Sequence, residues 1–290
     1  MIPVMSNLSP VAAIDFGISN TDIVAQVNGE RRQWTQPYTG YPDPDQVRAI
    51  LAKGGVDLTS LAILAVTGGR HRLLPAQIGA CVVQSVGELE AIGRGGQAIA
   101  ALTGDLAQQP LLVVSAGSGT AMIKAEGQRY NHVTGTAVGG GTMLGLARLL
   151  IDTVDPQEID ALAQAGNSNG VDLSLADVIT GPIGTLPAEA TAVNFGRLAR
   201  ATATPRRADL AAGIVTLVGQ TIALIAVNAA RTLPTTQIVI TGHLTDMVTI
   251  RRMLTAVGGL YGQTFHMPAA AGYATALGAL LTVQEQARSS

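Results

Sequence analysis

The sequence predicts an α/β protein built as two related lobes that face one cleft. The main evidence is a repeated module, in which an apolar strand is followed by a glycine-containing turn and a second strand. It occurs over residues 11–27 and again over residues 111–124. The length of 290 residues supports this division, because domains of about 100–200 residues can each bury a core. We place the lobes at residues 1–108 and 109–290.

The composition is that of a folded protein without a basic surface. Hydrophobic residues make up 47% and charged residues 13%, with a net charge of -2 and a mean hydropathy of +0.33. Nucleic acid is therefore a poor partner, because no basic field is available to hold a polyphosphate backbone. Cys81 is the single cysteine, which excludes an intrachain disulfide framework. Residues 1–15 lack a secretory-signal pattern, so we expect a cytoplasmic protein.

One uncharged stretch, residues 210–230, is long enough to cross a bilayer, since about 20 apolar residues suffice. Its large aliphatic residues recur at helical spacing on one face, whereas polar residues such as Thr216, Gln220 and Asn228 would meet acyl chains at a cost. We therefore expect a buried core helix or an interface helix, and no membrane contact.

The first lobe is predicted in the order β-β-β-α-β, followed by a helix. The periodicity and the turn residues place strands at 11–16, 21–27, 31–35 and 61–66, and helices at 44–53 and about 88–102.

The second lobe opens with the same module and then becomes mainly helical. Strands are expected at 111–114, at 122–124, shortly after the turn at 126–127, and at 237–241, with helices at 143–151 and 269–283.

The first glycine turn follows Asp15, an acidic residue at a strand end. Gly17, Ser19 and Asn20 favour turns for local reasons, so an ordinary hairpin is one interpretation. The other is a phosphate site, in which the loop amides with Ser19 and Asn20 hold a terminal phosphate. Asp15 would then orient Mg²⁺, directly or through water.

The second glycine turn comprises Gly117, Ser118, Gly119 and Thr120. Backbone N–H groups in such turns converge on anions without side-chain bulk, so the pair of turns suits a nucleotide in the cleft. Met122 occupies the place of the third glycine of a dinucleotide fingerprint, and no P-loop or nucleophile-elbow motif occurs. The four histidines, His71, His132, His243 and His266, show no metal-ligand spacing. We expect structural or supporting roles for most of them.

Three consecutive glycines, Gly139, Gly140 and Gly141, precede an apolar helix. They could let that helix pack closely against a neighbour. Alternatively they form a floor for adenine and ribose, since the roughly 1 kcal/mol that each glycine costs against alanine implies a close approach.

Glu88 and Glu90 begin a predicted helix, where the helix dipole favours carboxylates by about 0.3–1 kcal/mol. That effect alone explains acidic residues at these positions. Their helix is also rich in small residues, including Gly93 and Gly95, which lets another surface come near.

Taken together, these segments resemble the type II pantothenate kinase (Fumble-like) family, within the actin, hexokinase and sugar-kinase superfamily. The resemblance runs nearly end to end and is most specific over residues 134–146, residues 166–173 and residues 192–196. It implies a two-lobed ribonuclease H-like fold with duplicated mixed β-sheet cores, a nucleotide cleft between the lobes, and a helical insertion and dimerisation helix in the second. It also implies a homodimer.

The implied reaction is phosphoryl transfer from MgATP to the primary hydroxyl of pantothenate, the first step toward coenzyme A. Glu88, with Glu90, Ala91 and Gly95 behind it, matches the family's general base. The two glycine turns would hold the β- and γ-phosphates. The resemblance further implies an adenosine contact at Gly242 and at the three glycines, and substrate contacts at His132 and Gly135.

Three positions depart from the family pattern. Asp22 stands where the family has a lysine, Ile18 where it has a second glycine, and His132 where it has a substrate-contacting arginine. Histidine does not clamp a carboxylate as arginine does. Two alternatives therefore stay open: a related kinase for another hydroxyl substrate, and a nucleotide-binding regulator without transfer activity, against which Glu88 argues.

Overall fold

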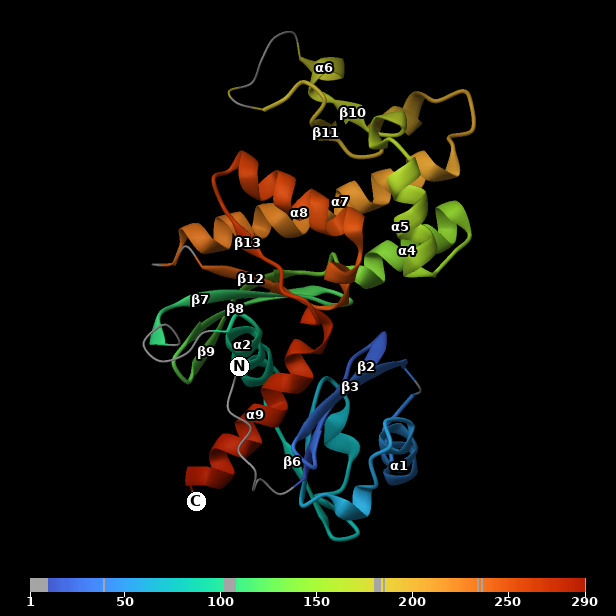
Figure 1. The fold of residues 1–290 in the computed structure, drawn as a ribbon. Helices are drawn as coiled ribbons and strands as arrows, with labels where there is room; N and C mark the ends of the chain where they lie inside the picture. The colour runs from blue at the N-terminus through green and yellow to red at the C-terminus, as the bar shows by residue number, and fades with distance from the viewer. Residues whose placement is uncertain are drawn as a thin grey trace.

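The computed structural model describes residues 10–38, 40–101, 108–179, 184, 186–233, 235 and 237–289. Two β-sheets with helices on both faces dominate it (Figure 1). One has six strands in the order β3-β2-β1-β4-β6-β5 and the other five in the order β13-β12-β7-β8-β9. Both combine parallel and antiparallel pairs, which confirms the predicted α/β class with two mixed sheets.

The first sheet and its helices come mainly from the first hundred residues. The strands are β1 (Val11–Phe16), β2 (Asn20–Val27), β3 (Glu30–Pro37), β4 (Ile63–Thr67), β5 (Gln77–Ile78) and β6 (Cys81–Ser85), and the helices are α1 (Pro44–Lys53) and α2 (Glu88–Ile99). The predicted helix over 88–102 thus ends at Ile99, and Leu102 lies outside the described residues.

The second sheet is followed by most of the helices. Its strands are β7 (Leu111–Ala116), β8 (Thr120–Glu126), β9 (Arg129–Thr136), β12 (Ile238–Thr241) and β13 (Phe265–His266), and a small pair is formed by β10 (Leu173–Ser174) and β11 (Thr191–Val193). The helices are α4 (Gly140–Ile151), α5 (Pro156–Ala165), α6 (Leu175–Val178), α7 (Arg207–Arg231), α8 (Val248–Leu260) and α9 (Ala274–Ser289).

The predicted repeat of the strand–turn–strand module is confirmed. β1 pairs with β2 and β7 with β8 in the same antiparallel manner, and β1 and β7 share one burial pattern. In both strands only the fifth residue is partly exposed: Asp15 in β1 and Ser115 in β7. A glycine, Gly17 or Gly117, follows two residues later. The two lobes therefore place their strand ends and glycine turns equivalently.

Local signals explain the clearest helix. Asp43 caps α1 by accepting hydrogen bonds from the backbone N–H groups of Asp45 and Gln46, and Pro44 occupies the first turn, where its missing N–H costs nothing. The helix ends at Lys53, and Gly54 is its C-cap. These bounds match the prediction from the sequence.

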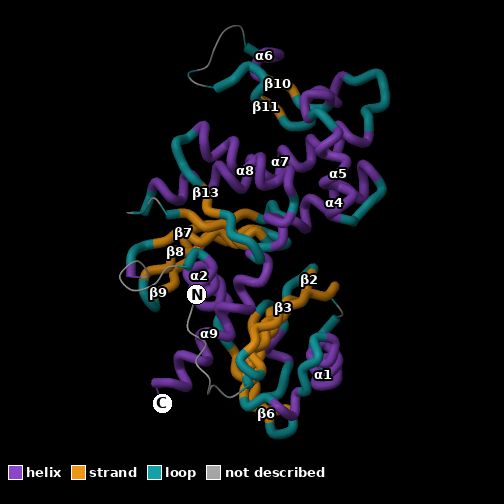
Figure 2. The backbone as a smooth tube through the Cα atoms, viewed as in Figure 1, coloured by secondary structure: helices purple, strands orange, loops and turns teal. Residues whose placement is uncertain are grey.

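Successive residues of the central strands face opposite helix layers, because side chains alternate across a strand. In β1, Ala12 and Ile14 pack with the core under α1, whereas Val11 and Ala13 pack with α9. In the second sheet, one face packs against α4, α5, α7 and α8 and the other against α2 (Figure 2). Each sheet is thus buried on both faces.

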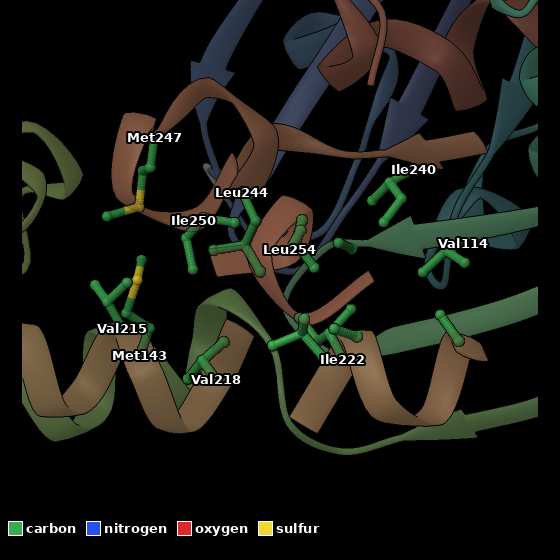
Figure 3. Close-up of a cluster of buried hydrophobic side chains, with 14 of the residues drawn as sticks. Val114, Met143, Val215, Val218, Ile222, Ile240, Leu244, Met247, Ile250 and Leu254 are labelled. Atoms are coloured by element: carbon green, nitrogen blue, oxygen red, sulfur yellow. The ribbon is translucent and has the colours of Figure 1, made fainter. Parts of the chain in front are cut away.

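The long apolar helix α7 lies within the core of its own lobe. Its residues Val215, Val218 and Ile222 approach side chains of β7, β12, α4 and α8 (Figure 3). In the described chain it is the helix long and apolar enough to cross a membrane, and 72% of its most apolar window is buried inside the molecule. The expected core helix is confirmed.

Two helices, α2 and α9, lie between the lobes and connect them by packing on different sheets. α9 ends the chain but packs on the first sheet, through Ala276 and Leu280 among others, whereas Ile92 of α2 packs on the second sheet. The predicted lobe boundary at residues 108/109 stays a prediction. It assigns α9 to the second lobe, although α9 packs on the sheet of the first lobe.

Glycines make the crossing of α2 and α9 possible. A Cβ atom added at Gly95 would lie 1.9 Å from the carbonyl oxygen of Ala274, and one added at Gly278 would lie 1.9 Å from that of Ala91. Any side chain at these positions forces the helices apart, so the small residues of α2 serve close helix packing.

Gly95→Ala is expected to lower the free energy of unfolding by about 1–3 kcal/mol, because the added methyl group overpacks the crossing of the two helices. Urea denaturation measures the change. Gly145→Ala is the matched control: Gly145 is exposed in α4 and an added Cβ would meet nothing within 4 Å, so this change should stabilise by about 0.5–1 kcal/mol. Equal effects of the two substitutions would contradict the packing argument.

Candidate active site

A cleft with a cavity volume of about 480 Å³ lies where the two lobes meet. Both glycine turns line it, together with the start of α2 and the segment after β12. The predicted site residues that line this one cavity are Asp15, Gly17, Ser19, Asn20, Glu88, Gly117, Ser118, Gly119, Thr120, Gly140 and Gly242. The structure thus brings together residues that lie up to 227 positions apart, from Asp15 to Gly242.

The two glycine turns touch each other across the cleft. The hydroxyl groups of Ser19 and Ser118 are hydrogen bonded at 2.7 Å, although they belong to different sheets. Residues of both turns line the same cavity, which is the arrangement expected for two loops that hold neighbouring phosphates.

The three glycines before α4 support the second turn. The N–H of Gly140 donates to the carbonyl of Gly117 at 2.8 Å, and that of Gly141 donates to the carbonyl of Ser118 at 2.9 Å. A Cβ added at Gly139 would lie 2.7 Å from the carbonyl oxygen of Ser118. Close packing therefore accounts for the tract. Gly139 and Gly141 do not line the cavity, and their contact with adenosine stays a prediction.

Asp15 is the most perturbed acid in the cleft. Burial, followed by the negative charges of Asp22 and Glu88, raises the pKa of Asp15 to about 7, while the charge of His243 opposes the shift. Its strand neighbour in β4, Thr67, has a buried hydroxyl without a hydrogen-bond partner among the described residues. Burial and like charges thus disfavour an ionised Asp15 unless a cation is present.

These groups fit a magnesium ion that brings further ligands with it. Carboxylate and hydroxyl oxygens are the donors that Mg²⁺ prefers, and it commonly binds through one or two carboxylates plus substrate phosphates and water. Among the described residues no group of three or more acidic, histidine or cysteine side chains could hold a metal alone. The site suits a metal that arrives with a nucleotide.

Glu88 begins α2 and lines the cavity, where it is exposed. Gly87 precedes it in extended conformation, and a Cβ there would meet nothing within 4 Å, so the approach to Glu88 is open. Glu90, two residues later, does not line the cavity. The two glutamates of the motif therefore have different surroundings, and only Glu88 can meet a ligand in the cleft.

His243 is a site residue that the sequence analysis did not identify. Its Nε2 lies 2.8 Å from Oδ1 of Asp22 and its Nδ1 lies 2.8 Å from Oδ2 of Asp246. Burial alone would lower its pKa, but the hydrogen bonds and charges of both carboxylates raise the pKa to about 10. A possible signal was its position directly after Gly242, which the resemblance had placed at the nucleotide.

His132 and Gly135 lie on β9 and do not line the cleft. The side chain of His132 is exposed, and a Cβ at Gly135 would lie 2.7 Å from the carbonyl oxygen of Thr120. Gly135 therefore lets β9 approach the second glycine turn. Substrate contact at either position stays a prediction.

The pKa of Asp15 predicts a pH-dependent effect of Asp15→Asn on thermal stability. The folded-state pKa is raised above the unfolded value, so the folded state binds the proton more tightly and wild-type stability falls as pH rises from about 4 through about 7. Asp15→Asn removes this loss. In metal-free buffer its Tm should exceed that of wild type at pH of about 8, by more than at pH of about 5. The same difference at both pH values would contradict the assignment.

Comparison with solved structures gives the class of fold. The activator of the 2-hydroxyisocaproyl-CoA dehydratase from Clostridium difficile, with bound ADPNP, superposes with a TM-score of 0.63 at 15% identity, covering 97% of this chain and 96% of that one. A ROK family glucokinase from Streptomyces griseus, in complex with glucose and AMPPNP, gives 0.60 at 10% identity, covering 95% and 99%. The chain therefore has the two-lobed ribonuclease H-like fold of the actin and hexokinase type, as predicted.

Comparison of sequences gives the family. The model of the Fumble family matches residues 97–282, well over half of the chain, so the protein belongs to the Fumble family. A type II pantothenate kinase from Oceanobacillus iheyensis is 29% identical over 226 residues, which cover 78% of this chain and 84% of the relative. The resemblance stated from the motifs is confirmed.

Proposed function

We propose that the protein transfers the γ-phosphoryl group of ATP to the primary hydroxyl of pantothenate, forming 4'-phosphopantothenate for coenzyme A biosynthesis. The observation that carries the proposal is the meeting of two glycine turns, one from each lobe, over a cavity that Glu88 also lines. Similarity to a type II pantothenate kinase from Oceanobacillus iheyensis supports the choice of acceptor.

The nucleotide would be held mainly by the backbone. Residues 17–20 and 117–120 line the cavity, and backbone amides of such glycine turns can donate to the β- and γ-phosphates. Among the described residues that line the cleft there is no lysine or arginine. Catalysis would therefore depend on positioning and on charge stabilisation by amides and a metal ion, as is general for phosphoryl transfer.

Asp15 would hold Mg²⁺, directly or through water, with the hydroxyl of Thr67 beside it. When bound, the ion neutralises charge on the phosphates during transfer. Asp15 has to be ionised for this role, and the positive ion favours that form.

Glu88 would act as general base toward the acceptor hydroxyl. It stands in the first turn of α2 and lines the cavity. An ionised carboxylate at the cleft can accept the proton that the hydroxyl loses on attack. The metal and the base would then reach the same cavity from different elements, β1 and α2.

A second candidate is a related kinase that acts on another hydroxyl compound. One observation favours it: the described lining of the cleft offers no lysine or arginine for a carboxylate. A nucleotide-binding regulator without transfer activity is the third, and Glu88 in the cleft argues against it.

We also propose that the protein is a cytoplasmic homodimer. Most of α7 is buried within its own lobe, so the contact with a second copy would have to use other surfaces or the few exposed positions of α7, such as Leu224. The resemblance implied a dimerisation helix, and α7 could serve as one only through these exposed positions.

Glu88→Gln is expected to lower kcat/KM for pantothenate about 10²- to 10⁴-fold, because the amide cannot accept the hydroxyl proton. A coupled assay of ADP formation measures the rate, and calorimetry should show nearly unchanged ATP binding. Glu90→Gln is the matched control, since Glu90 does not line the cavity, and it should retain activity.

Full activity of the Glu88→Gln enzyme would contradict the proposed base. A wild-type enzyme that ignores pantothenate but phosphorylates another alcohol would support the second candidate. ATP binding without turnover on any hydroxyl compound of a panel would support the third.

A further inference from the structure

One histidine joins the two lobes at the wall of the cleft. His243 belongs to the short helix η5 (His243–Asp246) of the second lobe, and Asp22, which it contacts, lies on β2 of the first. Both residues line the cavity. Besides the hydrogen bond of Ser19 with Ser118, this contact is a polar link across the cleft.

The hydrogen bonds indicate a charged imidazole ring. Both ring nitrogens of His243 face carboxylate oxygens at 2.8 Å. An ionised carboxylate only accepts hydrogen bonds, so each nitrogen has to donate, and a ring with two N–H groups is the imidazolium cation.

The two carboxylates differ in how far they are exposed to solvent, and therefore in the free-energy cost of losing the histidine as a partner. The side chain of Asp22 is only 9% exposed, whereas that of Asp246 is 60% exposed. Water screens the charge of an exposed carboxylate, but a buried one without a partner pays a large desolvation cost. Neutralisation by His243 therefore matters mainly for Asp22.

The ring has little freedom to leave this position. A Cβ added at Gly272 would lie 2.4 Å from Cε1 of His243, and the ring of Tyr273 meets the imidazole edge to face at a centroid distance of 5.6 Å. Gly242 supplies the turn before it with a φ of +96°. Both carboxylates, the backbone at Gly272 and the ring of Tyr273 thus hold the imidazolium in place.

The positive charge of His243 reduces the repulsion between the acidic cleft and the phosphates of a nucleotide. Asp15, Asp22 and Glu88 line the cleft, and His243 is the basic side chain among the described lining residues. Asp22 is the strand partner of Asp15 and follows the first glycine turn by two residues. An unpaired carboxylate at this position would repel a triphosphate held by that turn.

We propose that His243 is a positioning residue for nucleotide binding: it carries, from the second lobe, the positive charge that neutralises Asp22 beside the first phosphate turn. The inference deepens the proposed kinase function and rests on it.

A double-substitution cycle tests this role. The variants are His243→Gln, Asp22→Asn and the double variant Asp22→Asn/His243→Gln, with His266→Gln as control because His266 is exposed on β13 and does not line the cleft. The measurements are KM for MgATP and kcat at saturating acceptor, and the Kd of MgADP by calorimetry without acceptor.

His243→Gln should raise KM for MgATP and Kd for MgADP about tenfold or more, with a smaller change in kcat, because it leaves Asp22 unpaired. Asp22→Asn alone should not raise either constant, because it removes the carboxylate that His243 neutralises. The double variant should recover most of the affinity, since no carboxylate is then left unpaired. His266→Gln should match wild type.

A double variant as impaired as His243→Gln, or an unchanged affinity in His243→Gln, would overturn the proposal. Should His243→Gln not fold, the double variant decides: near wild-type Kd supports the proposal, and a raised Kd or an unfolded chain refutes it. Failure of the kinase function would appear separately, as wild-type protein that binds MgADP but phosphorylates no acceptor.

Discussion

The site depends on the contact between two glycine turns that belong to different sheets. The hydroxyl groups of Ser19 and Ser118 meet at 2.7 Å, and the backbone of each turn packs closely against its neighbours. A Cβ at Gly17 would lie 2.6 Å from the carbonyl oxygen of Asn20, and one at Gly139 would lie 2.7 Å from that of Ser118. Side chains at these positions would push the turns out of the geometry in which their amides can share one ligand.

The same constraint recurs away from the site. α2 and α9 cross at Gly95 and Gly278. α9, from the end of the chain, packs on the first sheet, and Ile92 of α2 packs on the second. Since Glu88 begins α2, the helix that joins the lobes also positions the proposed base. Packing and chemistry therefore depend on one element: a shift of α2 against α9 would move Glu88 relative to both phosphate turns.

Local patterns explain what could be predicted from the sequence. The hairpins at residues 11–27 and 111–126, the capped helix α1 and the apolar helix α7 depend on alternation, turn residues and helical spacing within short windows. These elements, and the two turns at the cleft, were predicted. Short strands such as β5 and β13, each two residues long, were not, because two residues carry no periodicity.

Contacts between segments far apart in the sequence could not be predicted from such local patterns. The small residues of α2 predicted that a surface would come near, but not that it would be α9. The position of His243 after Gly242 indicated the cleft but not its partner, because Asp22 is 221 residues away and the pairing follows from the contact of the two lobes. For Gly139 and Gly141 the packing alternative describes the structure, because both lie against the second turn rather than in the cavity.

The central claim, that the two glycine turns hold the phosphates of one nucleotide within reach of Glu88, is tested most directly by a crystal structure with Mg²⁺ and a non-hydrolysable ATP analogue. We expect the β- and γ-phosphates to accept hydrogen bonds from amides of residues 17–20 and 117–120, with Mg²⁺ near Asp15 and the Glu88 carboxylate facing the γ-phosphate across room for a hydroxyl. Phosphates bound elsewhere, or a Glu88 side chain directed away from them, would contradict the account.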